Sequence, residues 1–437
     1  MSSTLKAVRG TRDLLPPETA LWNRVEATAR FVFARYGFGE IRTPILESTE
    51  LFARGVGEET DIVSKEMYTW EDRARAASEK AQSLTLRPEN TAGVVRAYIE
   101  HKLGDTGHLQ KLYYIGPQFR RERPQKGRYR QFFQIGAEVI GPVTSGSESP
   151  LRDAEVLEML ATLLDELGIE RASESNGYKG WKLTLNSVGS ATDRPRYVAA
   201  LREALSPIKH LMCEDNQRRA ETNPLRVLDS KDEADQELID RLPKIADYLD
   251  DDSKSHFAQV LSALDACGIP YSVNPRLVRG LDYYTRTTFE FTVETGLGTQ
   301  NALLGGGRYD GLSEMIGGPK APGIGFAIGE DRLILTLQAQ ATEAAEKKLD
   351  AYIAPMGVEQ NAAALSLARD LRREGLSIEV GDGSFRLKKS FEIADRVARS
   401  ILILGEDEVT SGEITVKNFA TGEQRKIARD DLPELLR

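Results

Sequence analysis

A cluster of cationic residues near the middle of the chain is the first candidate for chemistry. Between Phe119 and Gln131 the sequence holds six cations against one anion, Glu122. The cations are Arg120, Arg121, Arg123, Lys126, Arg128 and Arg130. Beyond them, Gln134 and Glu138 share one face of an expected strand, because side chains alternate along a strand. The pattern suits a substrate with a polyanionic end and a polar end, but a solvated basic loop beside a half-buried strand also fits.

A second candidate is the segment RPENT (residues 87–91), which leads into an apolar helical stretch. Glu89 and Thr91 fall at the expected start of that helix. They can cap it, as threonine and an early glutamate commonly do. They can also act as a polar pair that holds an ammonium group. Taken alone, the pattern favours capping.

Two further arginines stand at unusual positions. Arg279 lies close to the pair Tyr283 and Tyr284, although a lone arginine at such a place is ordinarily a surface cation. Arg332 falls in the first turn of a helix expected from about Gly329, where the helix dipole disfavours a cation. Such local inconsistency is expected at functional sites. An arginine at a helix N-terminus suits a phosphate or a stacked base.

The glycine-rich stretches exclude two common nucleotide motifs. The chain has neither the G-x-G-x-x-G dinucleotide fingerprint in a βαβ setting nor a G-x-x-x-x-G-K-[ST] phosphate loop. The run Gly305–Gly306–Gly307 instead allows close approach of a ligand or another strand. If the protein uses ATP, arginines must hold the phosphates.

Composition indicates an ordinary soluble protein of two or three domains, with 437 residues and a net charge of −9. That charge does not exclude nucleic acid, because local cations decide phosphate affinity. Cys213 and Cys267 form no C-x-x-C pair, so neither a disulfide framework nor a zinc site is expected. The N-terminus lacks a signal-peptide core, and no apolar run reaches the roughly 18 residues of a membrane span. We expect a cytoplasmic protein with no membrane association.

The pattern of elements predicts three parts. The first is an α+β unit over residues 1–335, in which FGEIRTPILE (residues 38–47) suits either a subunit contact or a plain edge strand. Residues 192–266 are strongly charged with helical periodicity, and they predict an inserted helical domain. Residues 349–437 alternate strands and helices in a βαβαβ pattern, which predicts a separate α/β domain. Cations near the second helix of that domain fit a nucleic-acid face or a solvated helix.

Five stretches, taken in order, resemble the histidyl-tRNA synthetase family of class II aminoacyl-tRNA synthetases. FGEIRTPILE is similar to the dimer-interface motif, residues 119–138 to the second class motif, and GIGFAIGEDR (residues 323–332) to the third. LVRGLDYY (residues 277–284) and GGGRYDGL (residues 305–312) resemble two segments peculiar to the histidine enzymes. The resemblance covers essentially the whole chain. It implies an α+β fold: an antiparallel-sheet catalytic domain with a helical insertion, plus a C-terminal anticodon-binding domain.

The resemblance implies a histidine–tRNA ligase that uses ATP with Mg²⁺, binds L-histidine and its tRNA, and forms a homodimer. Arg120 and Arg279 would be catalytic at the α-phosphate of ATP, with Arg279 in the place of a metal, and the protein alone would hold no metal. Arg332, with Arg120, would bind ATP. Arg123 and Gln125, at the hairpin tip, would meet the acceptor end of the tRNA. The implied histidine-binding residues are Glu89, Asn90, Thr91, Arg120, Gln134, Glu138, Arg279, Tyr283 and Tyr284.

Two other protein classes have to be compared with this family, and two residues depart from the family pattern. The regulatory subunit of ATP phosphoribosyltransferase resembles the same catalytic domain, but it lacks the C-terminal domain and has gaps in the substrate motifs. A purely RNA-binding module does not explain LVRGLDYY. Arg121 and Phe133 depart from the residues common in the family, and neither position carries a role that we can name.

Overall fold

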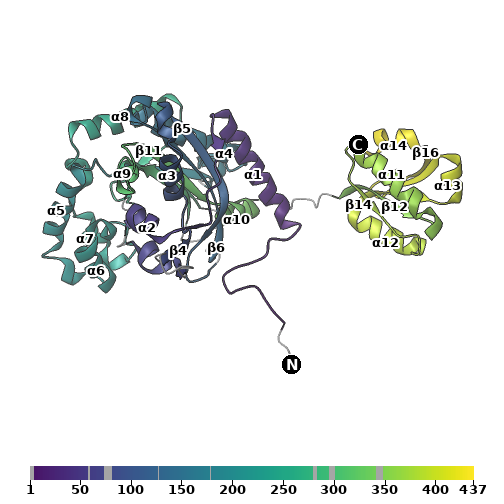
Figure 1. Ribbon diagram of the computed structural model, residues 1–437, viewed down its shortest axis with the longest axis horizontal. Helices are drawn as coiled ribbons and strands as arrows, with labels where there is room; N and C mark the ends of the chain where they lie inside the picture. Colours follow the sequence, from purple (N-terminus) through teal and green to yellow (C-terminus); the bar gives the residue numbers. More distant parts are fainter. Residues whose placement is uncertain are drawn as a thin grey trace. The chain divides into compact units, whose positions relative to one another are not determined.

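The cationic segment connects the two long strands β5 (Gln110–Phe119) and β6 (Gln131–Ile140), which pair antiparallel. The structure is a computed structural model (Figure 1) that describes residues 4–57, 60–72, 81–125, 127–177, 179–278, 283–294, 301–340 and 348–437. Phe119 lies opposite Gln131 in the register of the hairpin. The predicted hairpin with a cationic tip is therefore confirmed.

The chain divides into two units, Met1–Ala341 and Thr342–Arg437. In the described part of the first unit, the main sheet has the order β1-β5-β6-β11-β10-β9-β7-β8 and is antiparallel except at its two edge pairs. Its other strands are β1 (Gly39–Glu40), β7 (Trp181–Ser187), β8 (Ser272–Val273), β9 (Thr285–Val293), β10 (Ala302–Arg308) and β11 (Gly323–Gly329). A smaller sheet of order β2-β4-β3 comprises β2 (Leu46–Ser48), β3 (Tyr68–Asp72) and β4 (Gln82–Leu86). The predicted antiparallel α+β fold is confirmed.

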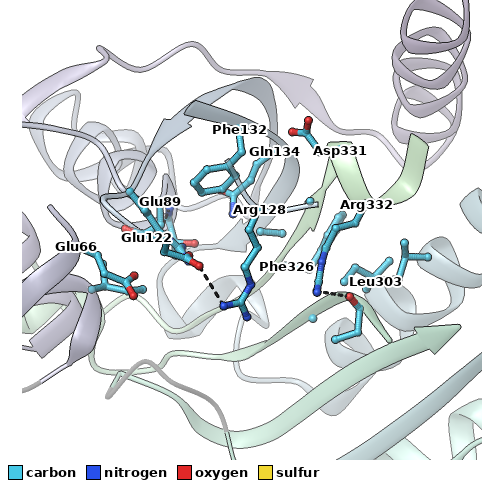
Figure 2. A pocket seen from close by; sticks show the side chains of 18 of the residues that line it. Glu66, Glu89, Glu122, Arg128, Phe132, Gln134, Leu303, Phe326, Asp331 and Arg332 are labelled. Atoms are coloured by element: carbon cyan, nitrogen blue, oxygen red, sulfur yellow. Dashed lines mark hydrogen bonds and ion pairs between the residues drawn. The ribbon is translucent and has the colours of Figure 1, made fainter. Parts of the chain in front are cut away.

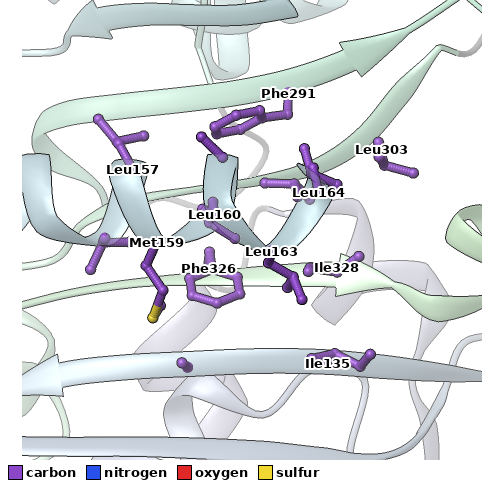
Figure 3. Packing of buried hydrophobic residues seen from close by; sticks show 14 of the residues in the cluster. Ile135, Leu157, Met159, Leu160, Leu163, Leu164, Phe291, Leu303, Phe326 and Ile328 are labelled. Atoms are coloured by element: carbon purple, nitrogen blue, oxygen red, sulfur yellow. The ribbon is translucent and has the colours of Figure 1, made fainter. Parts of the chain in front are cut away.

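One face of the main sheet is packed against helices. Alternate residues of β6, Ile135, Ala137 and Val139, join a buried cluster with side chains from the covering helices. Figure 3 shows the leucines of α4 above Ile135 and Phe326. Because side chains alternate, Gln134 and Glu138 lie on the opposite face of β6. The covering helices are α1 (Glu18–Arg35), α4 (Pro150–Glu166), α8 (Asp251–Ala266) and α10 (Glu330–Gln340).

A second buried cluster forms on the other face of the sheet and surrounds the polar residues there. It includes Tyr283, Tyr284 and Tyr309 together with Ala92 and Val95 of α3 (Thr91–Glu100). The short helices α2 (Thr49–Phe52) and α9 (Leu312–Met315) contribute further apolar side chains. This face therefore combines rigid aromatic packing with the candidate polar residues.

The inserted segment has a core of its own, made by residues between Tyr197 and Leu249. It contains α5 (Asp193–Leu205), α6 (Glu214–Thr222) and α7 (Gln236–Asp240). By contrast, Val260 and Leu264 of α8 belong to the main core of the first unit. We therefore propose that the inserted domain ends before α8, short of the expected boundary at residue 266.

The second unit contains the expected alternation of strands and helices and then continues beyond it. β12 (Leu349–Pro355), β13 (Ile378–Val380) and β14 (Ala398–Leu404) are parallel, with α11 (Asn361–Arg373) and α12 (Leu387–Val397) between them. The predicted βαβαβ order is therefore correct for these elements, but it does not cover the whole unit. An antiparallel hairpin of β15 (Glu413–Asn418) and β16 (Gln424–Ala428) extends the sheet, with α13 (Glu406–Ser411) and α14 (Leu432–Leu436) beside it. Over the described residues, no helix combines the length and apolar character needed to cross a membrane.

Glu330, the first residue of α10, is fully buried, and neither carboxyl oxygen has a hydrogen-bond partner among the described residues. Burial, with the nearby acids Glu26 and Asp331, raises its pKa from 4.5 to about 8. The folded protein therefore binds a proton that the unfolded chain releases, so this site stabilises the fold less as the pH rises from about 4.5 to 8. Glu330→Leu should raise the free energy of unfolding by ~1–3 kcal/mol, with a larger gain at pH 9 than at pH 5.

Urea unfolding at the two pH values measures this effect. Glu237→Leu is the matched control, because Glu237 is an exposed helical glutamate paired with Arg241. It should change stability by less than ~0.5 kcal/mol at both pH values. A loss of stability in Glu330→Leu at pH 9 would show that the carboxylate has a favourable partner.

Candidate functional site

A cavity of about 430 Å³ lies on the face of the main sheet that carries Gln134 and Glu138. Strands β6, β10 and β11, the cationic hairpin loop and the start of α10 all contribute to its lining. Arg226, from the inserted segment, also lines it and pairs with Asp61. Figure 2 shows acidic residues such as Glu122 and the arginines Arg128 and Arg332 directed into this space.

Glu138 is a fully buried carboxyl held by two hydroxyl donors. Thr91 Oγ1 donates to its Oε1 and Tyr309 Oη donates to its Oε2, each at 2.7 Å. Burial raises the pKa of Glu138 to about 8, although both hydrogen bonds act to lower it. A Cβ atom at Gly325 would lie only 1.7 Å from Oε2, so the neighbouring strand must carry glycine there. The site fixes one ionisable group in one orientation.

Glu89 caps helix α3, as the sequence favoured. Its carboxylate accepts hydrogen bonds from the backbone N–H of Thr91 at 2.8 Å and of Ala92 at 3.0 Å. The same side chain also lines the cavity, so capping and ligand binding are compatible. Nearby, Gln134 Oε1 is buried and has no partner among the described residues. A carboxylate and an unpaired amide oxygen that line the same cavity suit a cationic, hydrogen-bond-donating ligand group.

Two tyrosines close the polar end of the cavity. The rings of Tyr283 and Tyr284 are 4.8 Å apart and tilted, and both side chains are buried. Gly307 of β10 allows this packing, since a Cβ atom there would lie 2.8 Å from Cδ1 of Tyr284. The prediction that the glycine run permits close approach of another strand is confirmed at Gly306, where a Cβ atom would lie 2.1 Å from the carbonyl oxygen of Gly325 on β11.

The other end of the cavity is cationic. Arg120 donates from Nε to the carbonyl of Pro88 at 2.9 Å, and its guanidinium stacks 5.2 Å from the ring centre of Phe132. Arg128 pairs with Glu122 at 3.1 Å. Burial, and next the charge of Arg128, lower the pKa of Arg332. Cations held close enough to repel one another suit a polyanion, which would relieve that repulsion.

The structure brings together most of the predicted site residues but not all of them. Those lining the cavity are Glu89, Thr91, Arg120, Gln134, Tyr283, Tyr284 and Arg332. Glu138 lies behind this lining, where it accepts hydrogen bonds from Thr91 and Tyr309, which do line the cavity. Asn90 does not line it, and its Oδ1 accepts a hydrogen bond from Thr43, which also lies outside the lining. Arg123 and Gln125 are exposed on the hairpin. Arg279 lies outside the described residues.

Tyr309 and the preceding Arg308, which fixes its position, were not among the predicted site residues. The preceding residue, Arg308, is fully buried and donates to Asp153 of α4 and to the carbonyl of Ser147. The ion pair between Arg308 and Asp153 anchors the end of β10 to α4. Tyr309, the next residue in the chain, lines the cavity. The motif GGGRYDGL contained both residues, but a local pattern gives no sign of a partner 155 residues away.

The side chains were also compared with the ligand groups that hold metal ions. Among the side chains that the structure describes, no group of three or more His, Cys, Asp or Glu residues is placed to hold a metal ion.

This antiparallel sheet, with helices on one face and an arginine-bearing hairpin over a polar cavity on the other, has the fold of a class II aminoacyl-tRNA synthetase catalytic domain. A family model described as histidyl-tRNA synthetase matches residues 10–333, and one described as anticodon binding domain matches residues 350–437. The chain belongs to the histidyl-tRNA synthetase family.

Individual relatives agree over the full length. A histidine–tRNA ligase of Koribacter versatilis (strain Ellin345) is 68% identical over 434 residues, which are 99% of this chain and 96% of the relative. One of Solibacter usitatus (strain Ellin6076) is 55% identical over 430 residues, 98% of each chain. The crystal structure of apo S. aureus histidyl-tRNA synthetase is 38% identical and superimposes with a TM-score of 0.79, covering 99% of this chain and 100% of the other.

Proposed function

We propose that this chain activates L-histidine with ATP to form histidyl-adenylate and pyrophosphate, and then transfers histidine to the 3′ end of its tRNA. The observation that carries this function is the division of one cavity into two ends. At one end, Thr91 and Tyr309 line the cavity and hold the buried carboxyl of Glu138. The cations Arg120, Arg128 and Arg332 line the other end. An amino acid with a polar ring and a triphosphate would occupy these ends in turn.

At the polar end, Glu138 would read the imidazole ring. A carboxylate accepts a hydrogen bond from a ring N–H, whereas a protonated carboxyl donates one to a bare ring nitrogen. The raised pKa, about 8, keeps both forms accessible near neutral pH. Tyr284 and Tyr283 would pack against the ring, while Glu89, Thr91 and Gln134 would hold the ammonium group. A buried polar group left unpaired by the wrong side chain rejects that side chain strongly.

At the cationic end, the histidine carboxylate attacks the α-phosphorus of ATP and pyrophosphate leaves. Negative charge grows on the phosphoryl oxygens, so cations fixed beside them stabilise the transition state. Arg120 fits this role, with Arg332 at the γ-phosphate and adenine. ATP enters as its Mg²⁺ complex, bound through phosphate oxygens. We assign Arg279 to the α-phosphate on sequence resemblance alone.

The remaining assignments concern partners. We propose that the C-terminal unit contacts the anticodon and that FGEIRTPILE (residues 38–47) lies at a two-fold dimer interface, so the protein should sediment as a dimer at micromolar concentration. The cytoplasm, where tRNA is charged, is the compartment that fits this activity.

Aminoacylation tests the function as a whole. The protein, ATP with Mg²⁺, labelled histidine and transcripts of tRNA for histidine should give acid-precipitable label, and a tRNA for another amino acid should not. A regulatory subunit without ligase activity would bind histidine but charge no tRNA. That result would remove the proposed function.

The hairpin tip separates the two half-reactions. Arg123 and Gln125 are exposed and do not line the cavity, so the double substitution Arg123→Ala with Gln125→Ala should leave histidine-dependent pyrophosphate exchange within about threefold of the wild type. Aminoacylation should slow by ~10-fold or more, since a cation and an amide that hold phosphate and read a base edge are lost. The defect should shrink for a tRNA that lacks the extra 5′ guanosine expected in this family.

Both rates are measured on the same preparation. The matched control is Arg171→Ala with Gln259→Ala, which removes the same residue types from exposed positions outside the cavity lining and the hairpin. Equal losses in exchange and in transfer would place the tip over ATP and remove the tRNA assignment.

A further inference from the structure

The residues just before α1 lie against the cationic hairpin, although they belong to no helix or sheet. We call Arg9 to Arg12 the N-terminal strap. The backbone N–H of Arg130 donates to the carbonyl of Gly10 at 2.7 Å, and its guanidinium donates to the carbonyl of Arg9 at 3.1 Å. Gly10 has φ +91°, and a Cβ atom there would lie 2.8 Å from Cγ of Pro124. The strap is therefore fitted closely to the hairpin.

Arg12 joins this strap to the cavity. Its guanidinium pairs with Glu18 at 2.8 Å and with Asp331 at 3.1 Å. It also stacks over Tyr129, 4.9 Å from the ring centre, and lies 5.7 Å from the ring centre of Trp22. Tyr129 and Asp331 both line the cavity, whereas Arg12 stands behind them.

Asp331 places a carboxyl group beside the cations at one end of the cavity. Only 5% of it is exposed, and it directly precedes Arg332 at the cationic end of the cavity. Its Oδ2 accepts a hydrogen bond from the backbone N–H of Phe133 at 3.1 Å, and its Oδ1 faces Arg12. A carboxylate at this place repels a triphosphate unless a cation balances it.

We propose that Arg12 is a positioning residue for the nucleotide site: it neutralises Asp331 and holds it against the hairpin, so that ATP meets Arg128 and Arg332 and not an uncompensated carboxylate. This inference rests on the proposed use of ATP. Without Arg12, a nearly buried carboxylate would lose its cationic partner, which is a costly arrangement. Asp331 would then turn toward Arg332 and compete with the phosphates.

The test uses Arg12→Met, which keeps much of the side chain's apolar length and removes its charge. In histidine-dependent pyrophosphate exchange, the KM for ATP should rise by ~10-fold while the KM for histidine stays within about threefold. Adding Asp331→Asn to Arg12→Met should recover most of the lost ATP affinity, because the amide still accepts from Phe133 but carries no charge. Arg35→Met is the control, since it removes an exposed ion pair with Glu166. It should change neither KM.

Equal increases in both KM values, or no recovery in the double variant, would overturn the role of Arg12 and reduce it to a general structural contact. If Arg12→Met does not fold, Arg12→Gln makes the same test, because it is neutral yet still donates a hydrogen bond. Failure of the wild-type protein to show any exchange would refute the proposed function itself, and the two failures are thus distinguishable.

Discussion

Arg120→Ala should lower kcat for histidine-dependent pyrophosphate exchange by ~10²-fold or more while the protein remains folded. Arg120 lines the cavity, stacks on Phe132 and donates through Nε to the carbonyl of Pro88, so the rest of its guanidinium is presented in a fixed orientation. A cation fixed in this way interacts most strongly with the charge that develops on the α-phosphate in the transition state.

Arg121→Ala is the matched control for this result. Arg121 is the next residue in the same loop, it is exposed, and its guanidinium lies over Tyr68 outside the cavity lining. Its exchange rate should stay within about threefold of the wild type. Comparable losses in the two variants would mean that the loop acts through its overall charge and not through Arg120.

Glu138→Ala should lower kcat/KM for histidine by ~10²-fold, mainly through KM, and should relax discrimination against amino acids without ring nitrogens. The physical reason is that Glu138 is the fully buried carboxyl that Thr91 and Tyr309 hold in place. Removing it leaves those two hydroxyls without their acceptor and the ring without its partner.

Glu138→Gln refines this prediction, because it keeps the size of the side chain but cannot ionise. It should bind histidine better than Glu138→Ala and worse than the wild type, and the KM for ATP should change by less than about threefold in both. A rise in the KM for ATP alone would place Glu138 at the nucleotide.

Local sequence patterns predicted the elements that carry the site. Alternation along β6 predicted that Gln134 and Glu138 share one face of the strand. In the structure Ile135, Ala137 and Val139 belong to the buried cluster on the opposite face, and Gln134 lines the cavity. Such alternation is a property of neighbouring residues, so it can be read without knowing the fold. The same holds for the helix that begins at Thr91.

The features of the site that could not be predicted from the sequence depend on contacts between residues far apart along the chain. Asn90 turns toward Thr43, 47 residues earlier, and so leaves the cavity that its neighbours line. Arg308 pairs with Asp153 across 155 residues, and Arg12 meets Asp331 across 319. In each case both partners are ordinary polar residues in their local context, and only the fold shows that they pair.

Histidine-dependent ATP–pyrophosphate exchange, run in parallel with each of the other amino acids, shows directly whether this protein activates histidine and no other amino acid. It measures the adenylation step alone, so it requires no tRNA. We expect rapid exchange with histidine and exchange near background with every other amino acid. Exchange with a different amino acid, or none with histidine in a folded protein that binds ATP, would contradict this expectation.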